Sequence, residues 1–211
     1  MEELEELLKQ YNLEHSEDLS LSPWRSQYCR VPFPKYWQRV YQIMNDIDRS
    51  NRVIEIGCGQ GDVTAIFCYL GFQEVASFEK EQALVTKAKR RINDLFDRKD
   101  VIVQGLFPEK DILRCDVLVL VNCAYQDLAG SRDEYKRLLM NYYASAGYPQ
   151  YFIMEVIDSS YTQYDKEFPN HIRLSYEDVE EMFPNFRIQS WATYIFPQNR
   201  KSKTLYLIEK K

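Results

Sequence analysis

The stretch EIGCGQG, at residues 55–61, indicates the fold of this chain more clearly than any other segment. It begins within the run 52–56, which is typical of a buried strand, and it precedes a helix expected over 62–70. Glycines in such a turn allow a tight bend and let the backbone approach a ligand, while the helix directs free N–H groups at that ligand. The segment therefore predicts a ligand-binding turn between the first strand and the next helix.

The spacing of the glycines separates two kinds of ligand. Dinucleotide-binding turns follow the pattern G-x-G-x-x-G, whereas here Asp62 stands where the third glycine of that pattern is expected. Glu55, just before the first glycine, suits a cationic amino group better than a pyrophosphate. Glu79 ends the next strand-like run, close to the roughly 20-residue offset at which an acidic residue binds ribose hydroxyls. The pattern favours S-adenosylmethionine over NAD.

Strand-like and helix-like runs alternate along the rest of the chain. The last two strand-like runs, 186–196 and 203–208, are separated only by residues 197–202, which leaves no room for a parallel crossover and predicts an antiparallel hairpin. We expect an α/β fold with a seven-stranded, mostly parallel sheet, an antiparallel C-terminal hairpin and helices on both faces. The other expected strands are 74–79, 101–103, 115–121 and 151–156, and the other expected helices are 81–97, 132–143 and one from 175.

Two amphipathic helices are expected before the first strand, one over 4–11 and one after Pro34. They predict an N-terminal helical lid over residues 1–48 on a core over 50–211. A length of 211 residues fits one such domain, spanning residues 1–211.

Composition excludes several classes of protein. The net charge of −5 disfavours a general nucleic-acid binder, and no apolar run is long enough for a membrane helix. The five cysteines include no C-x-x-C pair, which argues against a disulfide framework and a zinc site, so no metal is expected. The acidic start is unlike a signal or transit peptide, and a cytoplasmic protein is expected.

With these motifs, residues 50–210 resemble the class I S-adenosylmethionine-dependent methyltransferases, which implies a Rossmann-like core and that cofactor. By this resemblance the three glycines would line the methionine and ribose part of the cofactor, Glu55 would contact its amino end, and Glu79 would bind both ribose hydroxyls. Leu106 replaces the aspartate that often binds adenine in the family, so its backbone and the Phe107 ring would serve instead. The cofactor-binding residues expected in the core are Glu55, Gly57, Gly59, Gly61, Glu79, Lys80, Leu106, Phe107 and Asn122.

The N-terminal segment and two loops supply further candidates. By the same resemblance, Tyr28 would cover the sulfonium and Arg30 would meet the methionine carboxylate; plain core packing is the alternative for Tyr28. His171, in a loop after the fifth strand, and Tyr125, after the fourth, are the candidate catalytic residues.

The resemblance implies a methyltransferase that acts on an oxygen or nitrogen of a small molecule, without nucleic-acid or membrane partners. The alternatives are a nucleic-acid or protein methyltransferase, a methyltransferase-like protein that binds without catalysis, and an NAD enzyme. The pair Asn122 and Tyr125 and the run Lys87–Arg91 are the only support for a nucleic-acid or protein substrate.

Overall fold

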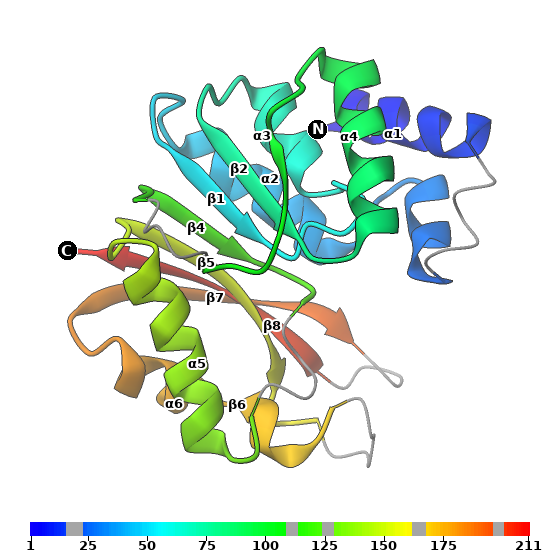
Figure 1. Cartoon of the computed structure of the whole chain (residues 1–211). Helices are drawn as coiled ribbons and strands as arrows, with labels where there is room; N and C mark the ends of the chain where they lie inside the picture. Colours follow the sequence, from blue (N-terminus) through cyan, green and yellow to red (C-terminus); the bar gives the residue numbers. More distant parts are fainter. Residues whose placement is uncertain (16–22, 109–113, 124–128, 162–167, 196–200) are drawn as a thin grey trace.

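The computed structural model describes residues 1–15, 23–108, 114–123, 129–161, 168–195 and 201–211 (Figure 1). The helices are α1 (Glu2–Glu14), α2 (Lys35–Asp46), α3 (Thr64–Leu70), α4 (Gln82–Phe96), α5 (Arg132–Ser145) and α6 (Tyr176–Met182), with the 3-10 helices η2 (Pro23–Cys29) and η3 (Asn170–Ile172). The strands are β1 (Val53–Ile56), β2 (Val75–Glu79), β3 (Ile102–Gln104), β4 (Val117–Leu120), β5 (Tyr151–Asp158), β6 (Arg173–Leu174), β7 (Phe186–Ile195) and β8 (Lys201–Lys210).

The strands form one mixed sheet in the order β3-β2-β1-β4-β5-β8-β7. Strands β1 to β5 pair in parallel, and β8 runs antiparallel to both β5 and β7. The predicted seven-stranded, mostly parallel sheet with a closing antiparallel hairpin is therefore confirmed. The sheet also holds an eighth strand, β6, whose two residues pair with the last two residues of β5. The sequence did not predict it, because a run of two residues shows no periodicity.

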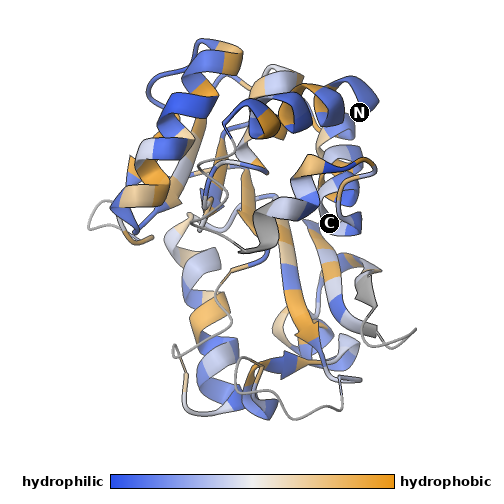
Figure 2. Ribbon diagram, turned by 90° about the vertical axis from the view of Figure 1, so that its right-hand side faces the viewer, coloured by the Kyte–Doolittle hydropathy of each residue, from blue (hydrophilic) through white to orange (hydrophobic). Residues whose placement is uncertain are grey.

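Alternate residues of the central strands supply two cores, one on each face of the sheet. On β4, Val117 and Val119 join the core under α1 to α4, whereas Leu118 and Leu120 join the core under α5 and α6. Figure 1 shows these two helical layers on opposite sides of the strands, and Figure 2 shows orange segments of the strands between helices of mixed blue and orange. The apolar β4 run is thus covered on both faces, as parallel strands require.

Local signals in the sequence explain several element ends. Gly71 ends α3 in the left-handed conformation (φ 87°), as expected for a C-terminal glycine. Ser175 and Asp178 form a reciprocal capping box at the start of α6, which confirms the predicted helix start.

The N-terminal segment is part of the core as well as a wall of the cavity described below. Leu4 and Leu8 of α1 and Trp37 of α2 are fully buried in the same cluster as α3 and α4. The Trp37 indole Nε1 donates a hydrogen bond to the Asp62 carbonyl oxygen (2.7 Å), which ties α2 to the glycine turn. No helix within the described ranges has both the length and the apolar composition needed to cross a lipid bilayer.

Candidate active site

The three glycines of the turn between β1 and α3 have different surroundings. All three adopt positive φ angles, of 71° at Gly57, 57° at Gly59 and 82° at Gly61, which L-residues rarely accept. A Cβ at Gly57 would lie 2.8 Å from the Cβ of Cys123, so the turn and the loop after β4 touch there. A Cβ at Gly59 would meet nothing within 4 Å, because Gly59 borders an open cavity.

Gly61 is the exception among the three glycines of the turn. A Cβ there would lie 3.4 Å from the Ile92 side chain on α4, and Gly61 is not among the residues that line the cavity. The structure therefore places Gly61 at the contact between the turn and α4, where it allows close packing, and not beside the ligand space.

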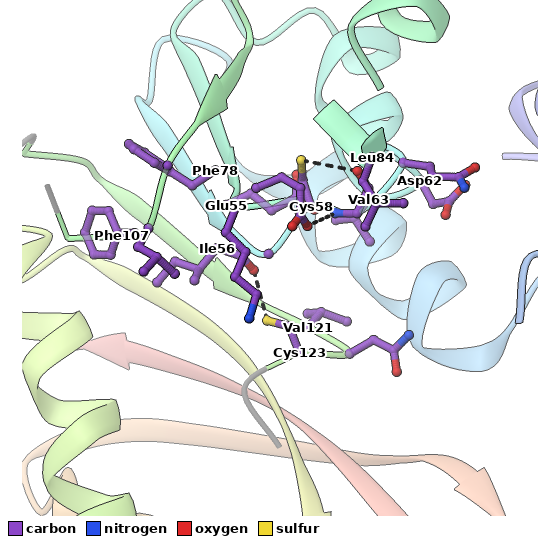
Figure 3. Close-up of a pocket in the computed structure, with 18 of the residues that line it drawn as sticks. Glu55, Ile56, Cys58, Asp62, Val63, Phe78, Leu84, Phe107, Val121 and Cys123 are labelled. Carbon is purple, nitrogen blue, oxygen red and sulfur yellow. Dashed lines mark hydrogen bonds between the residues drawn. The ribbon is translucent and has the colours of Figure 1, made fainter. Parts of the chain in front are cut away.

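The cavity has a volume of about 440 Å³ and lies at the carboxyl ends of β1, β2 and β4. Open parallel sheets bind ligands at this edge. Figure 3 shows Phe107 and Asp62 at opposite ends of the lining, with Glu55 and Cys58 between them. The predicted residues that line it are Tyr28, Glu55, Gly57, Gly59, Glu79, Lys80, Leu106, Phe107 and Asn122.

Glu79 sits at the carboxyl end of β2 with its carboxylate fixed by two backbone donors. Gly59 N donates to Oε2 and Glu81 N donates to Oε1, both at 2.9 Å. An ionised carboxylate has about four acceptor sites, so two bonds leave capacity for further donors. The side chain is thus held in one orientation at the cavity wall and can accept from ligand hydroxyls.

Glu55, on β1, is a buried carboxyl in the middle of the lining. The hydroxyls of Thr64 and Ser77 donate to its Oε2 at 2.6 and 2.8 Å. Burial raises the pKa of Glu55 from 4.5 to about 7, an effect that these two hydrogen bonds oppose and that the nearby carboxylates of Asp62 and Glu79 add to. A cation in the cavity would favour the ionised form.

The raised pKa of Glu55 predicts a pH dependence of stability. The folded protein disfavours the charged form, so the free energy of unfolding falls as pH rises from 4.5 to about 7, by about 3 kcal/mol in total. Glu55→Gln should remove this fall, which urea unfolding at pH 5 and pH 8 measures. Glu180→Gln, an exposed carboxyl on α6, is the matched control and should keep it. A Glu55→Gln protein with the same pH dependence as the unaltered one would contradict the assignment.

The end of the cavity beyond β3 is apolar. The Phe107 ring is buried and meets Phe78 edge-on with ring centroids 5.3 Å apart. Leu106 is 69% exposed although it lines the cavity, and Gly105 N donates to the Glu79 carbonyl oxygen (3.0 Å), which fixes the start of this loop. A flat apolar group could lie here beside Leu106 and Phe107, next to the carboxylate of Glu79.

The opposite wall comes from η2 and α2. The hydroxyls of Tyr28 and Tyr36 are hydrogen-bonded to each other, and both side chains are buried and line the cavity. Burial raises the pKa of both tyrosines, so both hydroxyls stay neutral. Tyr36 is not among the cofactor-binding residues predicted from the sequence, because an aromatic residue in an amphipathic helix is equally typical of plain core. Arg30 is exposed and is not among the lining residues.

Asn122 follows β4 in the left-handed conformation (φ 55°). Its Oδ1 accepts a hydrogen bond from Lys203 Nζ (2.6 Å), and the same Nζ lies 3.7 Å from the buried carboxylate of Glu155. Cys123 Sγ donates to the Ile56 carbonyl oxygen (3.0 Å), and burial raises the pKa of this thiol, which keeps it protonated. The loop after β4 is thus tied to both β1 and β8.

The structure describes one of the two candidate catalytic residues, and that residue is not among those that line the cavity. His171 lies half-buried in η3, which contacts α5, and it is not among the lining residues. Tyr125 falls within 124–128, outside the described residues. The sequence also missed Gln60 and Asp62 as lining residues, because only the glycines of the turn carry a recognisable spacing.

A model of the protein-L-isoaspartate(D-aspartate) O-methyltransferase family matches residues 20–105 of this chain. A search of curated protein sequences finds no match.

Solved structures with the same fold include several methyltransferases. Magnesium protoporphyrin IX methyltransferase from Synechocystis PCC 6803, solved with bound S-adenosylmethionine, is 13% identical, with a TM-score of 0.63 over 98% of this chain and 97% of that one. The CcbJ methyltransferase from Streptomyces caelestis is 12% identical, with a TM-score of 0.62 over 84% of this chain and 91% of that one. A putative rRNA-methylase from Clostridium thermocellum is 12% identical, with a TM-score of 0.57 over 85% of this chain and 100% of that one.

The chain has the class I methyltransferase fold, which confirms the predicted fold. The family match and these neighbours together support an S-adenosylmethionine-dependent methyltransferase, as the sequence predicted. The descriptions of two of these neighbours name different methyl acceptors, a magnesium porphyrin and ribosomal RNA, so the likeness leaves the methyl acceptor open.

Proposed function

We propose that this chain, acting as a single domain over residues 1–211, transfers a methyl group from S-adenosylmethionine to an oxygen or nitrogen atom of a small molecule. The observation that carries the proposal is the cavity that joins Gly59, the fixed carboxylate of Glu79 and the apolar Leu106–Phe107 end along one wall. Ribose hydroxyls fit the remaining acceptor capacity of Glu79, and adenine fits the apolar end beside it.

The charge of the lining suits the same cofactor. Glu55, Asp62 and Glu79 contribute carboxylates, while Lys80 is the one basic residue among the described lining residues. A negative cavity attracts the sulfonium and ammonium of S-adenosylmethionine and repels a phosphate backbone. The Tyr28 and Tyr36 rings add aromatic surface, on which a sulfonium is stabilised.

When bound, the cofactor supplies an electrophilic methyl group. The task of this chain's own residues is then to hold the cofactor, to orient an acceptor atom in line and to exclude water, and orientation of this kind contributes roughly 7–11 kcal/mol. Residues 1–48 would form the wall that closes the cavity. A base is needed only for an acceptor that arrives protonated, and His171 and Tyr125 stay the predicted candidates for it.

A protein or RNA acceptor is the second candidate. The family match over residues 20–105 favours a protein acceptor, since that family is described as methylating isoaspartate in proteins. The net charge of −5 and the carboxylates of the lining weigh against RNA.

The acceptor class can be tested with methyl-labelled S-adenosylmethionine and a cell extract separated into small-molecule, RNA and protein fractions. We expect enzyme-dependent label in the small-molecule fraction, and its loss when the Glu79→Ala protein replaces the unaltered one. Label that enters only RNA or only protein would contradict a small-molecule acceptor, while the proposal that the chain is a methyltransferase would stand.

A further inference from the structure

Asn122 has a side-chain amide of which only one end is hydrogen-bonded within the described part of the chain. The residue is exposed and lines the cavity. Lys203 Nζ donates to its Oδ1 (2.6 Å), and because an ammonium only donates, this contact fixes which end of the amide turns toward Lys203. The Nδ2 group has no partner among the described residues, so it is available to donate to a ligand.

The ammonium of Lys203 is held in place from its other side. It lies 3.7 Å from Oε2 of Glu155, a fully buried carboxylate on β5. The Thr193 hydroxyl on β7 donates to Oε1 of the same carboxylate (2.6 Å). Since a buried charge is costly unless it is paired, Glu155 keeps the ammonium beside Asn122. Three strands of the sheet, β5, β7 and β8, therefore set the orientation of the Asn122 amide.

Asn122 lies apart from the residues proposed to bind ribose and adenine. Glu79 ends β2 and Phe107 follows β3, whereas Asn122 follows β4, and β1 lies between β2 and β4 in the sheet. On the other side, Asn122 approaches the wall that carries Tyr36. Burial is the main cause of the raised pKa of Tyr36 and the charge of Glu155 adds to it, so Glu155 lies close to this wall. The space between Asn122 and Tyr36 can therefore hold a methyl acceptor while the cofactor occupies the rest.

The groups around Asn122 suit an oxygen atom of an acceptor better than an amine. An amine presents N–H groups, and it carries a positive charge when protonated. The Oδ1 that could accept from these groups is already bound to an ammonium, and the charge of Lys203 repels a second cation. A hydroxyl or carboxylate oxygen presents lone pairs, which accept from Nδ2 and are attracted by Lys203.

We propose that Asn122 Nδ2 donates to an oxygen atom of the methyl acceptor, with Lys203 as the positioning residue, and that the chain methylates a hydroxyl or carboxylate oxygen and not an amine. This inference rests on the proposed function and narrows its acceptor atom. It assigns Asn122, a predicted cofactor contact, to the acceptor. In the transfer, a lone pair of the acceptor oxygen forms the new C–O bond, and the electrons of the broken S–methyl bond stay on sulfur. A hydroxyl acceptor also loses its proton to water.

The bond in the product tests the acceptor atom. The unaltered protein is incubated with methyl-labelled S-adenosylmethionine and a cell extract, and each labelled fraction, freed of unreacted cofactor, is heated in hydriodic acid. Methyl groups on oxygen leave as volatile methyl iodide under conditions that N-methyl groups survive, and mild alkali releases methanol from esters but not from ethers. We expect all enzyme-dependent label to become volatile in hydriodic acid, and alkali then separates a carboxylate from a hydroxyl acceptor.

The outcomes separate this inference from the function on which it rests. Nitrogen-bound label in the small-molecule fraction would overturn the inference alone. Oxygen-bound label in the protein or RNA fraction would contradict a small-molecule acceptor and leave the inference standing. Label in no fraction would contradict both.

Asn122→Gly tests the contact itself. Glycine accepts the positive φ of 55° at this position, so the variant loses the amide and keeps the backbone. We expect methyl transfer to the labelled fraction to fall roughly 10- to 100-fold, while the calorimetric affinity for S-adenosylhomocysteine changes less than about threefold. Asp97→Gly, at an exposed position with a φ of 51° outside the cavity, is the matched control and should keep both. Unchanged transfer in Asn122→Gly, or an equal loss of cofactor affinity, would overturn the role of Asn122.

Lys203→Met tests the positioning role. Methionine removes the ammonium, so the Asn122 amide can turn, and transfer by the folded variant should fall as in Asn122→Gly without a matching loss of cofactor affinity. Lys203→Arg keeps a donor cation and should recover most of the transfer. Full transfer by Lys203→Met, or no recovery by Lys203→Arg, would overturn the role of Lys203.

Discussion

Glu79→Ala should lower the affinity for S-adenosylhomocysteine by roughly 100- to 1000-fold, because two hydrogen bonds from ribose hydroxyls to a carboxylate are lost together. The carboxylate is already oriented by Gly59 N and Glu81 N, so its binding geometry is set before the ligand arrives. The substitution also leaves those two N–H groups without this acceptor, and a modest fall in the melting temperature should accompany the loss of binding. Calorimetric titration measures the affinity of the folded variant.

The control for this prediction is Glu74→Ala. Glu74 is an exposed carboxylate just before β2, at the end opposite Glu79, where it pairs with Arg52 on the surface. It should bind S-adenosylhomocysteine as the unaltered protein does, since an exposed ion pair contributes little. Glu79→Ala with affinity within about threefold of the unaltered protein would mean that the ribose lies elsewhere.

Gly59→Val should abolish measurable cofactor binding while the protein still folds. A Cβ at residue 59 would meet no protein atom within 4 Å, so a larger side chain can be accommodated without displacing the protein. The valine would project into the cavity and exclude the ligand from it. The positive φ of 57° makes the variant less stable by roughly 1–3 kcal/mol. Affinity for S-adenosylhomocysteine should fall more than about 100-fold, as measured by calorimetry.

Gly71→Val separates backbone strain from blocked binding. Gly71 also has a positive φ, of 87°, and open space around its Cβ, but it ends α3 away from the cavity lining. Both valine variants should lose similar stability in urea unfolding, and only Gly59→Val should lose the ligand. Retained binding in Gly59→Val, or lost binding in both, would refute the position assigned to the ligand.

The sequence predicted the parts of the site that local patterns encode. The glycines 57 and 59 and the acid at 79 stand at fixed offsets from strands with clear periodicity, and the structure brings all three to one cavity. The closing hairpin was also predictable, because residues 197–202 leave no room for a crossover. The Ser175 capping box is encoded by four consecutive residues.

The remaining features depend on contacts between distant segments. The bond between Lys203 and Asn122 joins β8 to the loop after β4, and no local pattern relates the two residues. The hydrogen bonds that Arg91 donates to the turn could not be predicted, because a basic run is typical of an exposed helix face, whereas the structure buries Arg91. Gly61 is the opposite case. Its spacing predicted a contact with the ligand, but the side chains of α4 lie where a Cβ of residue 61 would point.

The measurement that tests the central claim most directly is a calorimetric titration of the unaltered protein with S-adenosylhomocysteine and, separately, with NAD. The cavity described here predicts saturable binding of one S-adenosylhomocysteine per chain and no heat of binding with NAD. Binding of NAD without S-adenosylhomocysteine, or of neither, would contradict the assignment of this cavity to S-adenosylmethionine.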